Sequence, residues 1–334
     1  MLLPIRIIAA VLASVVALAN AAGQASAQST NTGPLELETK IPLGEVRGRI
    51  DHMAVDLKRQ RLFVAELGND SLGVIDLANR KLIRTITGLR EPQGAGYEPS
   101  TDTLYVANAG DGSVRLFEGG DYNAAGRIEL GSDADDIRVD AAANRVLVGY
   151  GGGALAVIDP STRSKVEDIP LKAHPESFQI DPDTSQIFVN LPDARNIAVV
   201  DRASQKQIAK WPLTDRGANF PMALDHARRQ VLVIFRTPAE LGIFSMMDGA
   251  PIATTETCGD ADDLFIDAKR GRVYVSCGSG FLDVFETDGA VYRRIPTVSG
   301  ARTSLFVPEM DRLLVAVRAS SGEPAAIWVF RPMP

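Results

Sequence analysis

The chain repeats one pattern seven times between residue 50 and its C-terminus, at intervals of 41 to 44 residues. Each copy has two short apolar runs, then a turn rich in Gly, Asn and Asp, then a third run that usually ends in Asp or Glu. The position that ends the first run marks the copies: Asp56, Glu98, Asp140, Asp181, Asp225, Asp267 and Pro308. A period of this length indicates an array of small units that bury their faces against their neighbours.

The second copy predicts four strands, at residues 94–97, 104–107, 113–117 and 126–130, with an Asp-Gly turn between the middle two. Four strands in about 42 residues are typical of one propeller blade. We therefore predict an all-β, seven-bladed β-propeller with four antiparallel strands per blade. The seventh copy stops after its third strand, whereas residues 35–43 resemble an outer strand. We expect this N-terminal strand to close the last blade, because closure removes an exposed sheet edge.

The segment Leu104-Tyr-Val-Ala-Asn108 is a near match to a Tyr-Val-Thr-Asn core. Residues 35–331 thus resemble the YVTN family of exported bacterial propellers, which is named after that core. The segments 174–178, 218–222, 259–264 and 300–305 also look like those of exported YVTN-type propellers. The resemblance implies a fold and a compartment. It implies no reaction, because many members of the family have no assigned activity.

The N-terminus has the pattern of a targeting segment. Arg6 precedes an apolar run over residues 7–19, and Ala25-Ser-Ala27 fits a signal-peptidase site. We predict a signal peptide over 1–27, a short tail over 28–34 and a single propeller domain over 35–334. The alternative is an uncleaved anchor, although the run is short for a membrane span. We expect a periplasmic or secreted monomer without a membrane span after cleavage.

Two cysteines occur in the chain, Cys258 and Cys277. Cys258 precedes the first strand of the sixth copy and Cys277 ends its second strand, so both lie at the same edge of one blade. Export permits a disulfide between them; the alternative is two small buried thiols.

Function is best sought where the seven inner strands begin, because their first residues surround the axial channel. The positions five to seven residues before the markers, with their immediate neighbours, hold two of the three histidines and most of the clustered carboxylates. The candidates for ligand binding are Arg49, Asp51, Asp135, Asp136 and Asp263. The candidates for catalysis are His52 or His174 as general base, with Arg302 or Arg49 stabilising an oxyanion.

A hard cation such as Ca²⁺ or Mg²⁺ would take oxygen ligands from Glu176, Asn219 and Asp262 on three consecutive blades. This set resembles the Glu/Asn/Asp site of calcium-dependent lactonase propellers, which have six blades. The competing interpretation of the Asp residues at 133–136 and 260–263 is that each one caps a turn. At the opposite face, His226, Arg228-Arg229 and the basic turn 58–61 are expected to be solvated turn residues.

Three functions remain open from the sequence. The first is a binding or scaffold protein whose axial face holds a small molecule, a cation or a protein segment. The second is a metal-dependent hydrolase, lactonase or lyase that uses the same face. The third is nucleic-acid binding, which the formal net charge of −7 disfavours, because such binding needs Lys and Arg to neutralise phosphates.

Overall fold

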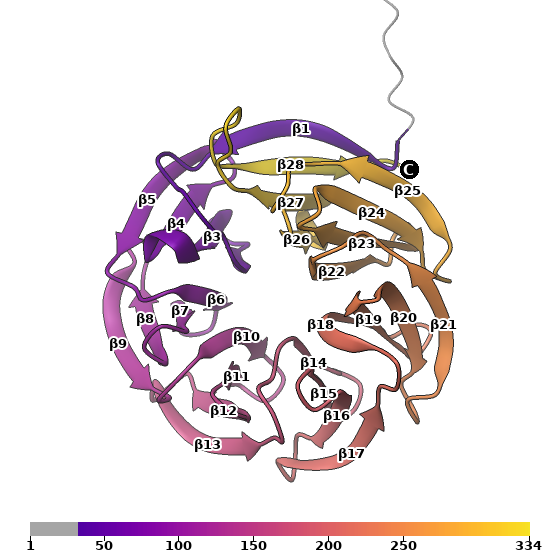
Figure 1. Cartoon of the computed structure of the whole chain (residues 1–334). Coiled ribbons are helices and arrows are strands. Elements are labelled where there is room, and N and C mark those ends of the chain that lie inside the picture. Colours follow the sequence, from indigo (N-terminus) through magenta and orange to yellow (C-terminus); the bar gives the residue numbers. More distant parts are fainter. Residues whose placement is uncertain (1–32) are drawn as a thin grey trace, which may run out of the picture. The chain divides into compact units, whose positions relative to one another are not determined.

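The computed structural model describes residues 33–334. They form seven four-stranded antiparallel sheets arranged around a central axis, as Figure 1 shows. The predicted all-β, seven-bladed propeller is confirmed. The predicted signal peptide lies outside the described residues. Among the described residues, no helix is long and apolar enough to cross a membrane.

The first strand of each blade lies nearest the axis. These inner strands are β2 (Met53–Asp56), β6 (Pro92–Glu98), β10 (Ala134–Asp140), β14 (Phe178–Ile180), β18 (Gly217–Asp225), β22 (Ala261–Asp267) and β26 (Thr303–Val307). The second strands are β3 (Arg61–Glu66), β7 (Thr103–Asn108), β11 (Arg145–Tyr150), β15 (Gln186–Leu191), β19 (Gln230–Thr237), β23 (Arg272–Cys277) and β27 (Arg312–Val317). Their apolar residues are buried on both faces, as expected for strands packed between two neighbouring blades.

The third strands are β4 (Ser71–Asp76), β8 (Ser113–Glu118), β12 (Ala154–Asp159), β16 (Asn196–Asp201), β20 (Ala239–Ser245), β24 (Phe281–Glu286) and β28 (Ala326–Pro332). The outer strands are β1 (Leu35–Pro42), β5 (Lys81–Thr87), β9 (Asn123–Glu129), β13 (Ser164–Pro170), β17 (Lys206–Pro212), β21 (Pro251–Glu256) and β25 (Val291–Pro296). Two short 3-10 turns, η1 (Leu67–Asn69) and η2 (Pro308–Met310), complete the described structure.

The N-terminal strand closes the ring as predicted. β1 pairs antiparallel with β28 in the seventh blade, which has the strand order β1-β28-β27-β26. Its register shifts between Leu37 and Thr39, and the outer strands of the other blades shift at a similar place, for example between Val74 and Ile75. A bulge adds local twist, so β1 has the geometry of an ordinary outer strand.

The acidic markers of the repeat cap the turns that follow the inner strands. Asp56, Asp140, Asp225 and Asp267 each accept a hydrogen bond from the backbone N–H three residues later. These carboxylates are buried, where an unpaired acceptor is costly. The turn chemistry therefore explains why an acidic residue recurs at this point of the period.

The expectation that the basic turn residues at this face are merely solvated is wrong for their four arginines, all of which form ion pairs. Two of them pair with a neighbouring blade. Arg59 of blade one donates to Asp102 of blade two at 2.8 and 2.6 Å. Arg229 of blade five donates to Asp181 of blade four at 3.1 Å. These side chains join neighbouring blades because each turn leans over the adjacent inner strand.

Candidate functional site

The turns that lead into the inner strands present one side chain per blade to the axis. In four blades this turn has a non-glycine residue with positive φ: Glu91 (49°), Asp133 (41°), Ala218 (54°) and Asp260 (59°). The next residue, Pro92, Ala134, Asn219 or Ala261, is buried. The residue after it faces the axial cavity. A register shift within each of these inner strands accompanies the change of direction, as expected because bulges re-aim side chains.

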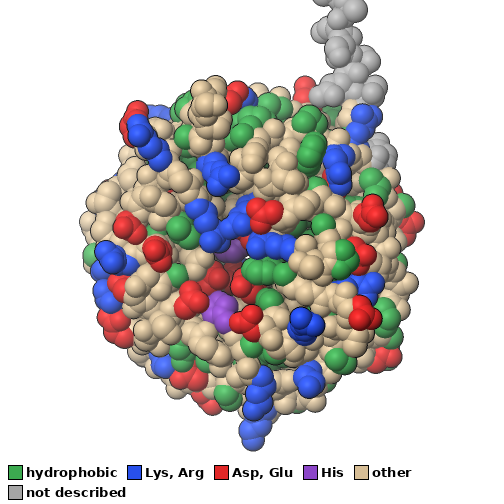
Figure 2. Space-filling model, viewed as in Figure 1, with side chains coloured by type: hydrophobic (Ala, Val, Ile, Leu, Met, Phe, Trp, Pro, Cys, Tyr) green, Lys and Arg blue, Asp and Glu red, His purple; other side chains and the backbone are tan. Residues whose placement is uncertain are grey.

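These side chains and their neighbours enclose a cavity of about 220 Å³. It is lined by Arg49, His52, Gln93, Asp133, Asp135, His174, Glu176, Phe220, Arg236, Asp262 and Arg302. Figure 2 shows Lys and Arg side chains gathered on one side of the central opening, and acidic and His side chains on the other. Charges brought together in this way are costly unless they are paired, solvated or bound to a ligand.

Three arginines form the cationic side of the cavity. Arg49 Nη2 lies 2.8 Å from Asp51. Arg302 contacts Asp260 and Asp262, at 2.9 Å each. Arg236 also donates to Asp262. One carboxylate therefore lies between two guanidinium groups.

A further contact fixes Arg236. Its guanidinium carbon lies 3.8 Å from the ring centroid of Phe220, a cation–π contact. The aromatic face is therefore already covered by a cation, and the cavity offers little apolar surface.

The anionic side belongs to blades three and four. His174 lies between Asp133 (3.6 Å) and Asp135 (3.8 Å) and donates from Nδ1 to the Gly151 carbonyl at 2.7 Å. Burial alone lowers the pKa of His174, but its contacts with Asp135, Gly151 and Asp133 outweigh burial and raise the pKa to about 9. Burial, together with the nearby Asp135 charge, raises the pKa of Glu176 to about 7. This side therefore has carboxylates without enough cationic partners.

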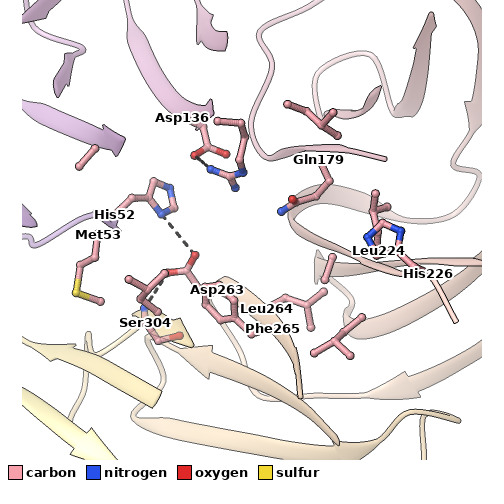
Figure 3. A pocket seen from close by; sticks show the side chains of 16 residues that line it. His52, Met53, Asp136, Gln179, Leu224, His226, Asp263, Leu264, Phe265 and Ser304 are labelled. Atoms are coloured by element: carbon pink, nitrogen blue, oxygen red, sulfur yellow. Dashed lines mark hydrogen bonds and ion pairs between the residues drawn. The ribbon is translucent and has the colours of Figure 1, made fainter. Parts of the chain in front are cut away.

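A second cavity of about 370 Å³ continues along the axis below the first. His52 lines both cavities, and its Nδ1 lies 3.5 Å from Asp263 (Figure 3). Burial alone lowers the pKa of His52, but the carboxylates of Asp263 and Asp51 outweigh it, and the pKa lies well above its ordinary value. Burial raises the pKa of Asp51 to about 8 and also raises that of Asp263.

His226 is an exposed turn residue, as expected, but it also contacts a neighbouring blade. It follows β18 at the far end of the axis, lines the second cavity, and lies 3.3 Å from Asp181. Among the described residues, one group of three potential metal ligands has its ligand atoms within 4.8 Å of one another: Asp181, Asp183 and His226. Asp181 is already engaged there, because it accepts hydrogen bonds from Thr184 and Arg229.

The structure brings most of the candidate residues to one place, but not all of them. Arg49, His52, Asp135, His174, Glu176, Asp262 and Arg302 line the upper cavity. Asp136 and Asp263 line the lower cavity, where Arg138 is paired with Asp136. Asp51 is buried beside Arg49.

Asn219 is not brought together with Glu176 and Asp262. It occupies the position that Ala134 and Ala261 hold in other blades, one residue before the one that faces the axis. Its side chain is fully buried. Its amide donates to Asn190 Oδ1 at 3.0 Å and to the Asn196 carbonyl at 3.2 Å. The three expected cation ligands therefore do not converge.

Turn capping does not describe the acidic residues at the mouth of the channel. Asp260 and Asp262 face Arg302 and Arg236. Asp263 accepts a hydrogen bond from the Ser304 N–H of the next blade at 2.8 Å. These carboxylates therefore contact residues of the neighbouring blades rather than the backbone of their own turns.

Arg236 is the main site residue that the sequence analysis missed. It lies on β19, which has eight residues where most second strands have six. The interval that contains β19, from Asp225 to Asp267, has the ordinary length of 42 residues. The spacing of the repeats therefore gave no signal for Arg236.

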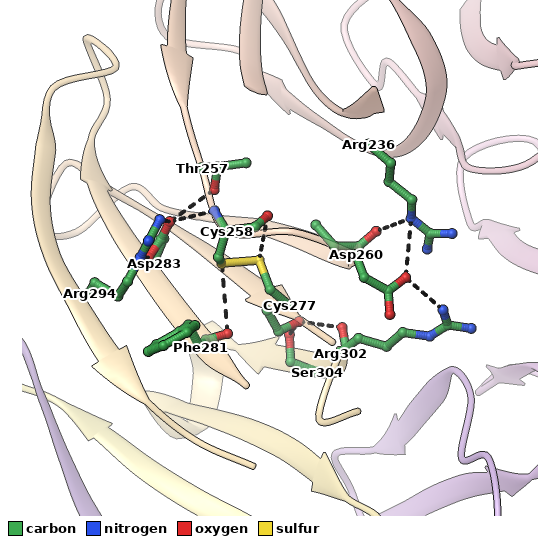
Figure 4. The surroundings of a disulfide bond; sticks show 12 residues. Arg236, Thr257, Cys258, Asp260, Cys277, Phe281, Asp283, Arg294, Arg302 and Ser304 are labelled. Atoms are coloured by element: carbon green, nitrogen blue, oxygen red, sulfur yellow. Dashed lines mark hydrogen bonds and ion pairs between the residues drawn. A yellow bond between two sulfur atoms is a disulfide. The ribbon is translucent and has the colours of Figure 1, made fainter. Parts of the chain in front are cut away.

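A disulfide joins Cys258 and Cys277 (Figure 4). It ties together two turns that also share backbone hydrogen bonds, from Gly278 N–H to the Asp260 carbonyl at 2.7 Å and from Ser279 N–H to the Gly259 carbonyl at 3.1 Å. The first of these turns carries Asp260 and leads to Asp262. The covalent bond thus supports the residues that hold Arg236 and Arg302.

The fold and the site define a seven-bladed propeller with a small, highly charged axial cavity. No family model matches the chain, and no curated protein matches it. Among solved structures it is similar to a chain of Kuenenia stuttgartiensis hydrazine synthase, with a TM-score of 0.75 and 16% identity. That match covers 91% of this chain and 98% of the other. At this identity the similarity shows the fold alone.

Proposed function

We propose that this protein is an exported, monomeric propeller of the YVTN type that binds a small polar ligand in its upper axial cavity. The resemblance of the repeats and the N-terminal pattern over residues 1–27 support the family and the compartment. The observation that carries the binding function is the cavity of about 220 Å³ lined by seven Arg, Asp or Glu side chains and two histidines from six blades. Stability alone does not require such a concentration of charge.

A hydrolytic or lyase function is less well supported by the geometry. The general-base role needs an imidazole that is neutral near pH 7. The pKa of His174 is raised to about 9 and that of His52 lies well above its ordinary value, so both rings hold their protons. Asp262 is already paired with Arg236 and Arg302, and the side chain of Asn219 is buried outside the cavity. Both observations disfavour the Ca²⁺ or Mg²⁺ site expected from these residues.

The proposal is tested on the purified mature protein with a thermal-shift screen of small charged metabolites, followed by calorimetric titration. We expect saturable binding of about one ligand per chain, abolished in a variant with both Arg302→Gln and Glu176→Gln. The matched control is Arg331→Gln, which removes an outer-strand ion pair with Glu36 and should leave binding unchanged. Elemental analysis with melts before and after chelation tests the alternative: a stoichiometric metal whose removal lowers the melting temperature would favour the metal-dependent function.

A further inference from the structure

The two sides of the upper cavity carry opposite charge. Arg49, Arg236 and Arg302 come from blades one, five and seven. Asp133, Asp135 and Glu176 come from blades three and four and face the same space. A purely anionic ligand would meet the carboxylates, and a purely cationic one would meet the guanidinium groups. The site is therefore complementary to a molecule that carries both charges.

The arginine side has hydrogen-bond donors to spare. Arg49 Nε is buried without a hydrogen-bond partner, and burial raises the pKa of its neighbour Asp51 to about 8. Arg49 therefore contacts Asp51 through Nη2 only, and its Nε remains without an acceptor. Arg236 and Arg302 share Asp262. Guanidinium groups match carboxylates in geometry and bind them through two parallel hydrogen bonds.

The acidic side has acceptors to spare. Asp135 and Glu176 both line the cavity, and the nearby Asp135 charge contributes to the raised pKa of Glu176. His174 is the cation on this side, and it is shared between Asp133 and Asp135. An additional cation placed between Asp135 and Glu176 would relieve their repulsion. A group with N–H donors is favoured there, because carboxylates are acceptors only.

The size and lining of the cavity narrow the ligand further. Its volume of about 220 Å³ lies below the ~300–1,000 Å³ typical of pockets that hold drug-sized ligands. A small ligand is therefore favoured. A quaternary ammonium group prefers an open aromatic face, and the Phe220 ring is covered by Arg236. A primary ammonium group fits the acidic side better.

We infer that the ligand is a small zwitterion, an amino acid or an amino sulfonate, with its anionic group on Arg49, Arg236 and Arg302 and its ammonium group on Asp135 and Glu176. This inference rests on the proposed binding function and specifies the ligand class of the same cavity. This arrangement requires no metal, because Asp135 and Glu176 bind the ammonium group of the ligand instead of a metal ion.

The test is calorimetric titration with matched compounds: glycine, β-alanine, γ-aminobutyrate and taurine against acetate, propionate, methylamine, ethylamine and Ca²⁺. We expect at least one zwitterion to bind about tenfold or more tightly than the anion or amine of similar length, since each half-molecule lacks one set of charge-assisted hydrogen bonds. Glu176→Gln should weaken zwitterion binding while retaining acetate binding. Arg302→Gln should weaken both, and Arg331→Gln should change neither.

Two outcomes would overturn the inference in different ways. Binding of acetate, an amine or Ca²⁺ as tightly as every zwitterion would refute the ligand class but keep the axial binding function. Failure of all the zwitterions would also refute the ligand class. The wider metabolite screen then decides the binding function separately.

Discussion

Single side chains at the far face hold neighbouring blades together. Arg59 donates to Asp56, to Tyr97 and, through two nitrogens, to Asp102. We expect Arg59→Ala to lower the free energy of unfolding by roughly 1–2 kcal/mol, because hydrogen bonds between charged groups are worth more than neutral ones and this one is partly exposed. Urea denaturation measures the change. The neighbouring exposed Lys58, changed to Ala, should stay within about 0.5 kcal/mol of the wild type; equal effects would contradict the inter-blade role.

His174 should impose a pH dependence on stability. Its pKa rises from 6.5 to about 9 on folding, so its stabilising effect is complete below about pH 6.5 and is lost as the pH rises toward 9. The nearby Asp133, Asp135 and Glu176 favour its charged form, whereas Arg236 opposes it. We expect the melting temperature to fall between pH 6.5 and 9, and His174→Asn to reduce that fall.

Glu176 should make folding stability depend on pH in a different pH range. Its pKa rises from 4.5 to about 7 on folding, so ionisation destabilises the folded state as the pH rises through this range. In the Glu176→Gln variant, the melting temperature should fall less between pH 4.5 and 7 than it does in the wild type. The fall above pH 7 should persist. An unchanged profile in both variants would show that the charges at the cavity do not affect folding.

At the scale of the element, the disulfide between β23 and the turn before β22 supports the cavity. In the chain-entropy view, a loop of this length stabilises a protein by about 3 kcal/mol. We expect urea denaturation of the double variant Cys258→Ser/Cys277→Ser to give a free energy of unfolding lower by about 3 kcal/mol. We also expect the variant to bind the ligand more weakly, because Asp260 and Asp262 lose support. Reductant should reproduce the effect in the wild type and have none on the double variant.

The elements were predictable from sequence because their signals are local. Alternation of apolar residues, Asp-Gly turns and capping carboxylates fix each blade within about 42 residues. The partners across the axis were not predictable, since they depend on how far each blade reaches toward the centre. Thus Arg236 was missed, and Asn219 was assigned to a cavity from which a bulged turn directs it away. The sequence also could not indicate that Arg59 bridges blades, because a surface turn and an inter-blade turn have the same composition.

At the scale of the whole molecule, β1 is the strand that converts an open array into a ring. Removing residues 33–43 would leave β28 with an unpaired edge and uncover buried residues of the seventh blade such as Ile327, Val329 and Phe330, which lie in the same core clusters as the deleted strand. Unpaired edges promote association between chains. We expect this truncated protein to aggregate or form oligomers in light scattering, while truncation up to residue 32 leaves the ring intact. A monomeric, equally stable truncated protein would contradict the closing role of β1.

The pairing of β1 with β28 also has a consequence in time. Pro42 pairs with Ala326, so about 280 residues are made after β1 before its partner exists. At ~5–20 residues per second, that interval lasts on the order of 15–60 s. β1 is the first strand to be made and β28 the last. The ring therefore cannot close until almost the whole chain exists.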